Sequence, residues 1–199
     1  MKRIYCAGPL FNPKEREDME AIADALQEAG YAVFLPHRDG IEMARVNSAL
    51  VRNGYSLAEA NSILARAIFK IDTYQVASND GLVLNLNGRV PDEGAMVEAG
   101  IAWALGKPVV IHKDDSRSLI DGLDNPLVAG LSKFRIITKI GQIPTEFDRI
   151  FSDGYGNVAA HYDRALKEII DTGKEIYSAY LKWKDPSTRS DGFLDLLAI

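Results

Sequence analysis

Short apolar runs alternate with stretches of helical hydrophobic spacing along most of the chain. The apolar runs predict strands at residues 3–7, 31–35, 81–86, 108–112 and 134–138. They are nearly continuous rather than alternating, which is typical of parallel strands that are covered by helices on both faces. The alternation of strands and helices therefore predicts a doubly wound α/β domain.

Helices are predicted between these strands at residues 13–30, 56–76 and 92–105. In the first of them apolar residues recur at helical spacing, and a capping box formed by Ser56 and Glu59 opens the second. Residues 40–55 are less regular, and we expect a loop with a helical turn there.

From residue 145 onward the pattern is helical, with a link at residues 186–192 and an apolar tail after it. We therefore expect an α/β domain at residues 1–154 and a helical extension at residues 155–199. The apolar stripe of the extension has to be covered, either by its own domain or by a neighbouring subunit.

The composition mainly excludes classes of partner and site. The chain is 47% hydrophobic with a net charge of −5, and its Lys and Arg residues form no block, which argues against a nucleic-acid partner. No apolar stretch is long enough to cross a membrane, so we expect a cytoplasmic protein without a membrane partner. The three histidines are far apart, which argues against a metal site, and the one cysteine, Cys6, lies in an apolar run that indicates a buried core residue.

The candidate chemistry lies in two loops. In an open parallel sheet, ligands bind at the carboxyl ends of the strands, where the strand order reverses. With the strand order 2-1-3-4-5, the reversal brings together the loops after the first and third strands, at residues 8–12 and 87–94. These loops hold most of the unusual residues of the chain.

Glu98 is an anomaly on the helix that follows the second loop. Spacing predicts the apolar stripe of this helix at Val97, Ile101, Ala104 and Leu105. Glu98 falls at the edge of that stripe, where a buried carboxylate is costly unless something compensates for it. Gly94, one turn earlier, leaves room for a ligand. Two interpretations remain open: a carboxylate of a site, or a glutamate at the surface rim of the stripe.

Asp92, Asp72 and Tyr5 lie around the same predicted crevice. Asp92 starts the helix that carries Glu98, where a helix cap is an equally good interpretation. Asp72 lies near the end of the preceding helix, where the helix dipole disfavours negative charge, so either solvation or a functional role accounts for it. Tyr5 belongs to the first strand, where a core tyrosine is the usual interpretation.

Several segments resemble the nucleoside 2-deoxyribosyltransferase family. They are the run IYCAGPLF at residues 4–11, Asp72, the run PDEGAMVEAG at residues 91–100 and the run ALGKPV at residues 104–109. The likeness covers residues 2 to 140, with a tyrosine, two aspartates and a glutamate in the order and contexts of the family. The helical tail after residue 155 has no match in the family's shorter members.

The resemblance implies a flavodoxin-like fold with a five-stranded sheet and a transfer of 2-deoxyribose between nucleobases, with hydrolysis as a side reaction. Glu98 would be the nucleophile that attacks the anomeric carbon to form a covalent glycosyl-enzyme, and Tyr5 would orient it. Asp72 and Asp92 would contact the base, and one of them would protonate the departing ring nitrogen.

The resemblance also implies how the site is completed. Gly8 and Phe11, from the first loop, are candidates for substrate binding, although Phe11 could equally be a packing residue. Family sites are often completed by a neighbouring subunit, so we expect a homo-oligomer, a dimer or a trimer of dimers, to which Asn125 contributes. The expected partners are nucleosides and free nucleobases.

Carboxylates suit this reaction. Cleavage of an N-glycosidic bond passes through an oxocarbenium-like state, which one carboxylate stabilises and traps while a second group assists the leaving base. Neighbouring carboxylates raise one another's pKa, which helps one of them to act as an acid near neutral pH. The reaction requires no metal and no organic cofactor.

Two other functions are kept as alternatives. A nucleoside 5′-monophosphate N-glycosidase needs hydroxyls, amides or arginines for the phosphate. The loop at residues 8–13 has neither Ser nor Thr and contains Pro9 and Pro13, which lack an amide donor, although Arg89 and Arg117 could bind a phosphate. A non-catalytic nucleotide-binding module of the same fold would bind its ligand without needing Glu98.

Overall fold

The computed structural model describes residues 1–88, 90–115, 124–153, 164–185 and 192–197. The chain divides into two compact units: Met1–Asp39 with Val76–His161, and Gly40–Gln75 with Tyr162–Ile199. The expected boundary at residue 154 would leave residues 40–75 in the α/β domain, whereas they group with the C-terminal helices. Sequence spacing identifies a helix but not the distant helix against which it packs.

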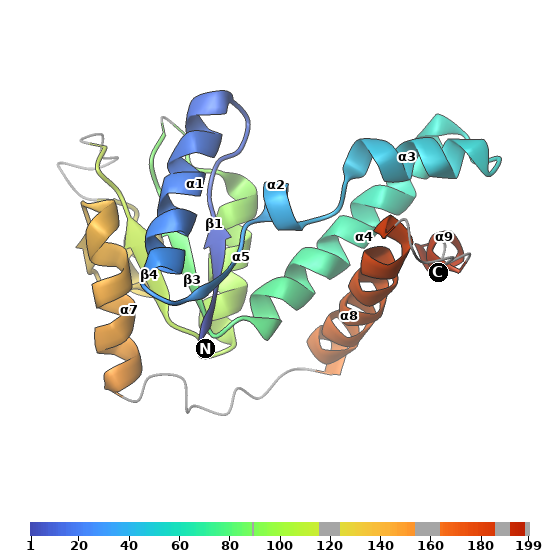
Figure 1. Ribbon diagram of the computed structural model, residues 1–199. Helices are drawn as coiled ribbons and strands as arrows, with labels where there is room; N and C mark the ends of the chain where they lie inside the picture. The colour runs from blue at the N-terminus through green and yellow to red at the C-terminus, as the bar shows by residue number, and fades with distance from the viewer. Residues whose placement is uncertain (89, 116–123, 154–163, 186–191, 198–199) are drawn as a thin grey trace. The chain divides into compact units, whose positions relative to one another are not determined.

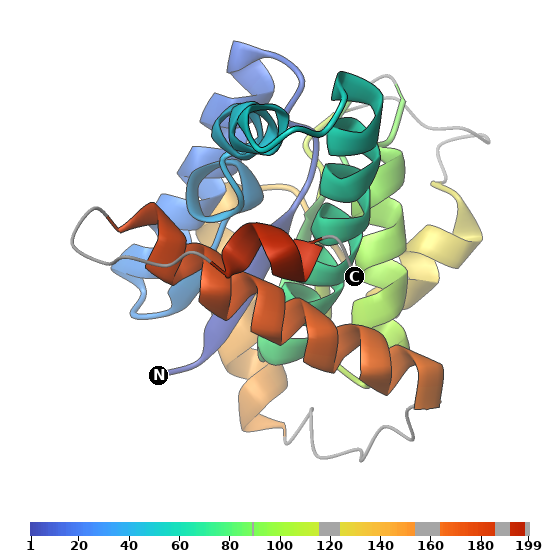
Figure 2. The ribbon, with the colours of Figure 1, turned by 90° about the vertical axis from the view of Figure 1, so that its right-hand side faces the viewer.

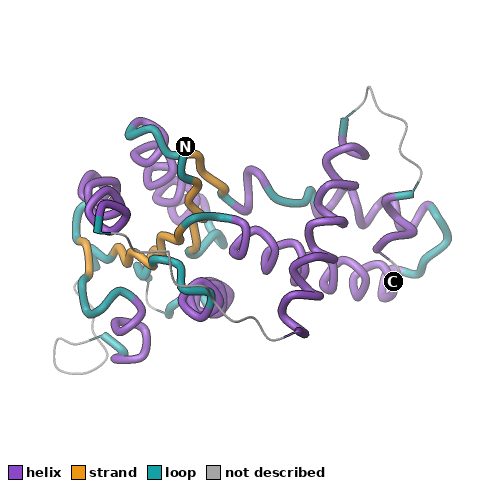
Figure 3. The backbone as a smooth tube through the Cα atoms, turned by 90° about the horizontal axis from the view of Figure 1, so that it is seen from below, coloured by secondary structure: helices purple, strands orange, loops and turns teal. Residues whose placement is uncertain are grey.

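The first unit is built on a five-stranded parallel sheet with the order β2-β1-β3-β4-β5, which confirms the predicted fold class. Figure 3 shows the strands in orange with helices around them. The strands are β1 (Arg3–Ala7), β2 (Ala32–Phe34), β3 (Gly81–Asn85), β4 (Val109–His112) and β5 (Ile136–Ile137). They are flanked by α1 (Pro13–Glu28), α2 (Pro36–Asp39), α5 (Glu93–Ala104), α6 (Pro126–Leu131), the 3-10 turn η1 (Ile140–Gln142) and α7 (Ile143–Ser152).

Helices cover both faces of this sheet (Figure 1). α1 and α7 pack on one face, against Cys6 and Val83, while α5 packs on β3 and covers the other face. Cys6 is fully buried, and burial raises the pKa of its thiol, so its prediction as a core residue is confirmed. Successive strand residues point to opposite faces, so Tyr5, the neighbour of Cys6, faces α5.

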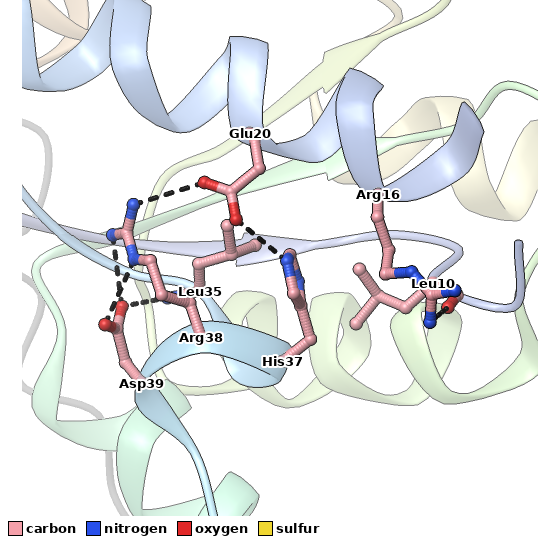
Figure 4. Close-up of polar contacts among 7 residues, drawn as sticks. All are labelled: Leu10, Arg16, Glu20, Leu35, His37, Arg38 and Asp39. Atoms are coloured by element: carbon pink, nitrogen blue, oxygen red, sulfur yellow. Dashed lines mark hydrogen bonds and ion pairs between the residues drawn. The ribbon is translucent and has the colours of Figure 1, made fainter. Parts of the chain in front are cut away.

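Polar contacts with α1 hold the short helix α2. The two carboxylate oxygens of Glu20 lie 2.8 Å from Nε2 of His37 and 3.3 Å from a guanidinium nitrogen of Arg38 (Figure 4). Arg38 also donates to Asp39 at 3.1 Å, and this hydrogen bond raises the pKa of the guanidinium above its ordinary value. These contacts fix the direction in which the chain leaves β2.

The face that α5 turns to the sheet differs from the predicted one. Of the predicted stripe only Leu105 is buried, and Val97 is 59% exposed. The buried positions within the helix are Ala95, Ala99 and Ala102. α5 is apolar on nearly all sides, so spacing alone could not select its buried face. Glu98 lies one turn from Ala95 and one turn from Ala102, and therefore borders the face that meets the sheet.

The second unit is helical in its described part. It consists of α3 (Met43–Arg52), most of α4 (Leu57–Ser78), α8 (Arg164–Lys184) and α9 (Phe193–Leu197). The prediction of a loop at residues 40–55 is wrong for its central part, because Val46 and Leu50 recur at helical spacing and are buried in the core of this unit. Among the helices that the structure describes, none is long and apolar enough to cross a bilayer.

Within the second unit, α8 crosses α4 (Figure 2). A Cβ atom at Gly173 of α8 would lie 2.0 Å from the carbonyl oxygen of Lys70 and 2.8 Å from the Cβ atom of Tyr74, both on α4. Only glycine allows the two helices to approach so closely. The crossing is therefore fixed by a residue that looks unfavourable for a helix.

Candidate functional site

Tyr5 and Glu98 form the centre of the candidate site. Tyr5 lies on β1 and is fully buried, and Glu98 lies on α5 and is partly buried. The Tyr5 hydroxyl donates a hydrogen bond of 2.6 Å to Oε1 of Glu98. This length is typical of a hydroxyl that donates to an ionised carboxylate. The contact holds one oxygen of the Glu98 carboxylate at the Tyr5 hydroxyl.

Asp92 caps the helix that carries Glu98. Its Oδ1 accepts a hydrogen bond of 2.9 Å from the backbone N–H of Gly94. The capping interpretation therefore holds in the structure. The cap uses Oδ1 only, so it does not prevent the same carboxylate from meeting a ligand at the carboxyl edge of the sheet.

Asp72 lies on α4 in the second unit, whereas Tyr5, Asp92 and Glu98 belong to the first, and each unit is described by itself. Burial raises the pKa of the Asp72 carboxyl from its ordinary 3.8 to about 6. A fully solvated aspartate would keep its ordinary pKa, so solvation alone does not account for this residue. A carboxyl group with a pKa near 6 can donate a proton close to neutral pH.

Asn87 ties the loop before Asp92 to the loop after β4. Its side-chain oxygen accepts hydrogen bonds from the backbone N–H groups of Asp114 and Asp115, at 3.0 and 3.2 Å. The N–H of Gly88 donates in turn to the Asp115 carboxylate at 3.3 Å, and Gly88 has a φ of +120°, which favours glycine. In the sequence the Asn-Gly pair directly follows the predicted strand at residues 81–86, and nothing local indicates its contact with a distant loop.

Gly8, Phe11 and Asn125 occupy three different environments. A Cβ atom on Gly8 would lie 2.6 Å from the sulfur of Met19, so this glycine permits close packing of the loop. Phe11 is 80% exposed. Asn125 is exposed and caps α6 through a hydrogen bond from the N–H of Leu127 at 3.0 Å. Arg89 and Arg117 lie outside the described residues.

Glu15, which is not among the site residues expected from the sequence, binds backbone N–H groups at the start of α1. One oxygen of its carboxylate accepts hydrogen bonds from the backbone N–H groups of Phe11 and Asn12, at 2.8 and 3.2 Å. Asn12 caps the N–H of Glu15 in return, at 3.0 Å. The spacing of Asn12 and Glu15 is a capping-box signal that could have predicted this arrangement.

Comparisons with known proteins agree with this fold. The family model described as nucleoside 2-deoxyribosyltransferase matches residues 4–169. A crystal structure of a conserved protein from Enterococcus faecalis V583 is 22% identical, with a TM-score of 0.55, and the match covers 75% of this chain and 98% of that one. No curated protein matches the chain.

Two further solved structures that are similar to this chain are of proteins named as enzymes. A 2-deoxyribosyltransferase from Bacillus psychrosaccharolyticus is 19% identical with a TM-score of 0.53, over 82% of this chain and 93% of that one. A CMP N-glycosidase from Clostridium botulinum is 18% identical with a TM-score of 0.42, over 74% of this chain and 99% of that one. At 22% and 19% identity, the likeness to the proteins from Enterococcus faecalis and Bacillus psychrosaccharolyticus shows the fold alone.

Proposed function

The chain belongs to the nucleoside 2-deoxyribosyltransferase family, and on that premise we propose that it transfers 2-deoxyribose between nucleobases through a covalent intermediate on Glu98. The observation that carries this proposal is the hydrogen bond of 2.6 Å from the Tyr5 hydroxyl to Glu98. It joins a carboxylate on α5, the helix that follows β3, to the central residue of β1, and ligands of this fold class bind at the carboxyl ends of the strands.

The proposed reaction has two displacements at the same carbon. Oε2 of Glu98 attacks the anomeric carbon while the bond to the base breaks, and the departing ring nitrogen takes a proton from an acidic side chain. A second base, or water, then attacks the glycosyl ester and releases the Glu98 carboxylate. A base as acceptor gives transfer with net retention, and water gives hydrolysis.

Replacing Tyr5 by Phe is expected to lower kcat by about 10- to 100-fold, with KM nearly unchanged, since it removes one hydrogen bond to a charged group. The ring that packs on Phe34 remains, so the protein should stay folded. Steady-state kinetics with a deoxynucleoside test this, and an unchanged kcat would contradict the proposed role of the hydroxyl.

The resemblance to the family offers Asp72 and Asp92 as proton donors, and of the two we propose Asp72, whose carboxyl has a pKa that burial raises to about 6. This group is protonated below that pH, so kcat/KM should fall as the pH rises through about 6. Replacing Asp72 by Asn should remove this limb of the pH profile and lower the maximal rate by about 100-fold or more. A limb that persists in the variant would assign the proton donor elsewhere.

Glu15 favours unphosphorylated nucleosides over nucleoside 5′-monophosphates. Its carboxylate already occupies the amides of Phe11 and Asn12, the kind of donors that a phosphate takes at a helix start. Replacing Glu15 by Gln keeps the capping geometry and removes the charge. We expect this variant to bind 2′-deoxyinosine 5′-monophosphate about tenfold more tightly than the unaltered protein does. Glu17→Gln, an exposed site on the same helix, is the control, and equal affinities in both variants would contradict this role.

We further propose a cytoplasmic homo-oligomer in which neighbouring subunits share active sites. Val97 and Trp103, on the outer side of α5, are 59% and 56% exposed, and a helix that is apolar on both sides is usually covered. Asn125 is the candidate that a neighbour contributes. Light scattering that gives the mass of a monomer would contradict this assembly.

Base exchange separates the proposed function from its alternatives. The protein is incubated with 2′-deoxyinosine, with and without adenine or cytosine, and every product is identified by chromatography. A new deoxynucleoside that forms only with the acceptor supports transfer. Hypoxanthine released at the same rate without acceptor would indicate a hydrolase, and bound ligand without turnover a binding module.

A further inference from the structure

Phe34 is a buried ring beside Tyr5. In the parallel pair of β1 and β2, Tyr5 lies opposite Phe34, so both side chains project from the same face of the sheet. Their ring centroids are 5.5 Å apart, and the ring planes are inclined by 22°. Both side chains are fully buried, so neither ring has water beside it.

Arg3 contacts the same ring. It precedes Tyr5 by two positions on β1 and therefore projects from the same face of the sheet. The guanidinium carbon of Arg3 lies 5.9 Å from the ring centroid of Phe34, within the range of a cation–π contact. Arg3 and Tyr5 thus both contact the Phe34 ring, and Tyr5 is the residue that donates a hydrogen bond to Glu98.

The geometry of a tyrosine explains why this matters for Glu98. The hydroxyl lies at the far end of the ring, so a small tilt at the Cβ atom displaces the hydroxyl more than it displaces the rest of the ring. A closely packed neighbour prevents such a tilt. The hydrogen bond of 2.6 Å to Glu98 requires that the hydroxyl keep its place. A displacement of about 1 Å in a catalytic arrangement costs on the order of 100-fold in rate.

We propose that Phe34 is a positioning residue for the reaction at Glu98 and that it acts through the Tyr5 ring. This inference rests on the proposed function, because it assigns Phe34 to the same nucleophile. Phe34 itself does not touch substrate in this proposal. Its effect is to keep the Tyr5 hydroxyl at the carboxylate throughout both displacements.

Phe34→Leu is the informative change, since it keeps an apolar side chain and removes the ring. Phe147→Leu is the matched control. Phe147 belongs to α7, is also fully buried, stacks on Phe151 with ring centroids 5.8 Å apart and an inclination of 18°, and packs in the core on the opposite face of the sheet. We expect Phe34→Leu to lower kcat by about 10-fold or more with KM unchanged, and Phe147→Leu to leave kcat unchanged.

A double-mutant cycle separates positioning from general stability. In the Tyr5→Phe background there is no hydroxyl to position, so Phe34→Leu should lower kcat there by less than about twofold. A structural defect would lower the rate equally in both backgrounds. An equal loss in both, or a loss no greater than that of Phe147→Leu, would overturn the proposal.

A spectroscopic measurement decides the same question without turnover. The Tyr5 hydroxyl proton should give a downfield proton NMR signal that is absent in Tyr5→Phe, because short hydrogen bonds to carboxylates deshield the proton. Phe34→Leu should shift or broaden this signal, and Phe147→Leu should not. An unchanged signal in Phe34→Leu would overturn the positioning role, whereas a shifted signal in a protein without base exchange would support it and reject the proposed function.

Discussion

Replacing Glu98 by Gln is expected to abolish base exchange, with kcat lowered by on the order of 1000-fold or more. An amide oxygen is too weak a nucleophile to displace the base. Gln has the shape of Glu and can still accept the hydrogen bond of 2.6 Å from Tyr5, so the local structure should persist. The measurement is the initial rate of deoxynucleoside formation from 2′-deoxyinosine and adenine, together with binding of the donor.

Glu93→Gln is the matched control for this prediction. Glu93 lies on the same helix, in its first turn, and is exposed. The Glu93→Gln substitution removes the same charge from α5 but leaves the hydrogen bond between Tyr5 and Glu98 in place. The kcat of this variant should stay within about twofold of that of the unaltered protein. Base exchange that survives in Glu98→Gln would exclude Glu98 as the nucleophile.

Replacing Gly173 by Ala should destabilise the second unit by about 2–3 kcal/mol, even though alanine is the better helix former. In an open helix the substitution gains about 1 kcal/mol. Here the new Cβ atom would lie 2.0 Å from the carbonyl oxygen of Lys70, which is backbone and cannot swing aside. The helices have to separate, and overpacking of this kind outweighs the gain in propensity. Thermal or urea unfolding followed by circular dichroism measures the change.

Gly100→Ala provides the opposite control. Gly100 also lies within a helix, α5, and a Cβ atom there would meet nothing within 4 Å. This variant should be more stable than the unaltered protein by about 0.5–1 kcal/mol. If both alanine variants were equally stabilised, this result would contradict the close approach of α4 and α8 at Gly173.

The sheet could be predicted from the sequence because its signals are local. Apolar runs, most of them bounded by glycine or proline, located the strands that the structure describes, and the order 2-1-3-4-5 assumed for them is one of the two common orders of doubly wound folds. β1 has the predicted bounds, whereas the other four strands are shorter than predicted at one or both ends, as in β5, where only Ile136–Ile137 pair. Strand ends depend on hydrogen bonds to a neighbour, which a run of apolar residues does not reveal.

The site could be predicted in part, and the reasons differ between residues. The run around Tyr5 and the run around Glu98 are 93 positions apart, and the resemblance to the family, not spacing, suggested that they meet. The wrong stripe on α5 shows the limit of spacing, since an apolar helix offers several possible faces and the small Ala99 packs on the sheet in place of Val97. The contact of Phe34 with Tyr5 could not be predicted from the sequence, because a phenylalanine in a strand is a common core residue.

Exchange of labelled base is the most direct test of the double displacement at Glu98. The protein is incubated with 2′-deoxyinosine and isotopically labelled hypoxanthine, with no other acceptor, and the label in 2′-deoxyinosine is followed by mass spectrometry. The proposed mechanism predicts that the label enters 2′-deoxyinosine in the unaltered protein and not in Glu98→Gln. Release of hypoxanthine without any entry of label, at any concentration of free base, would contradict it.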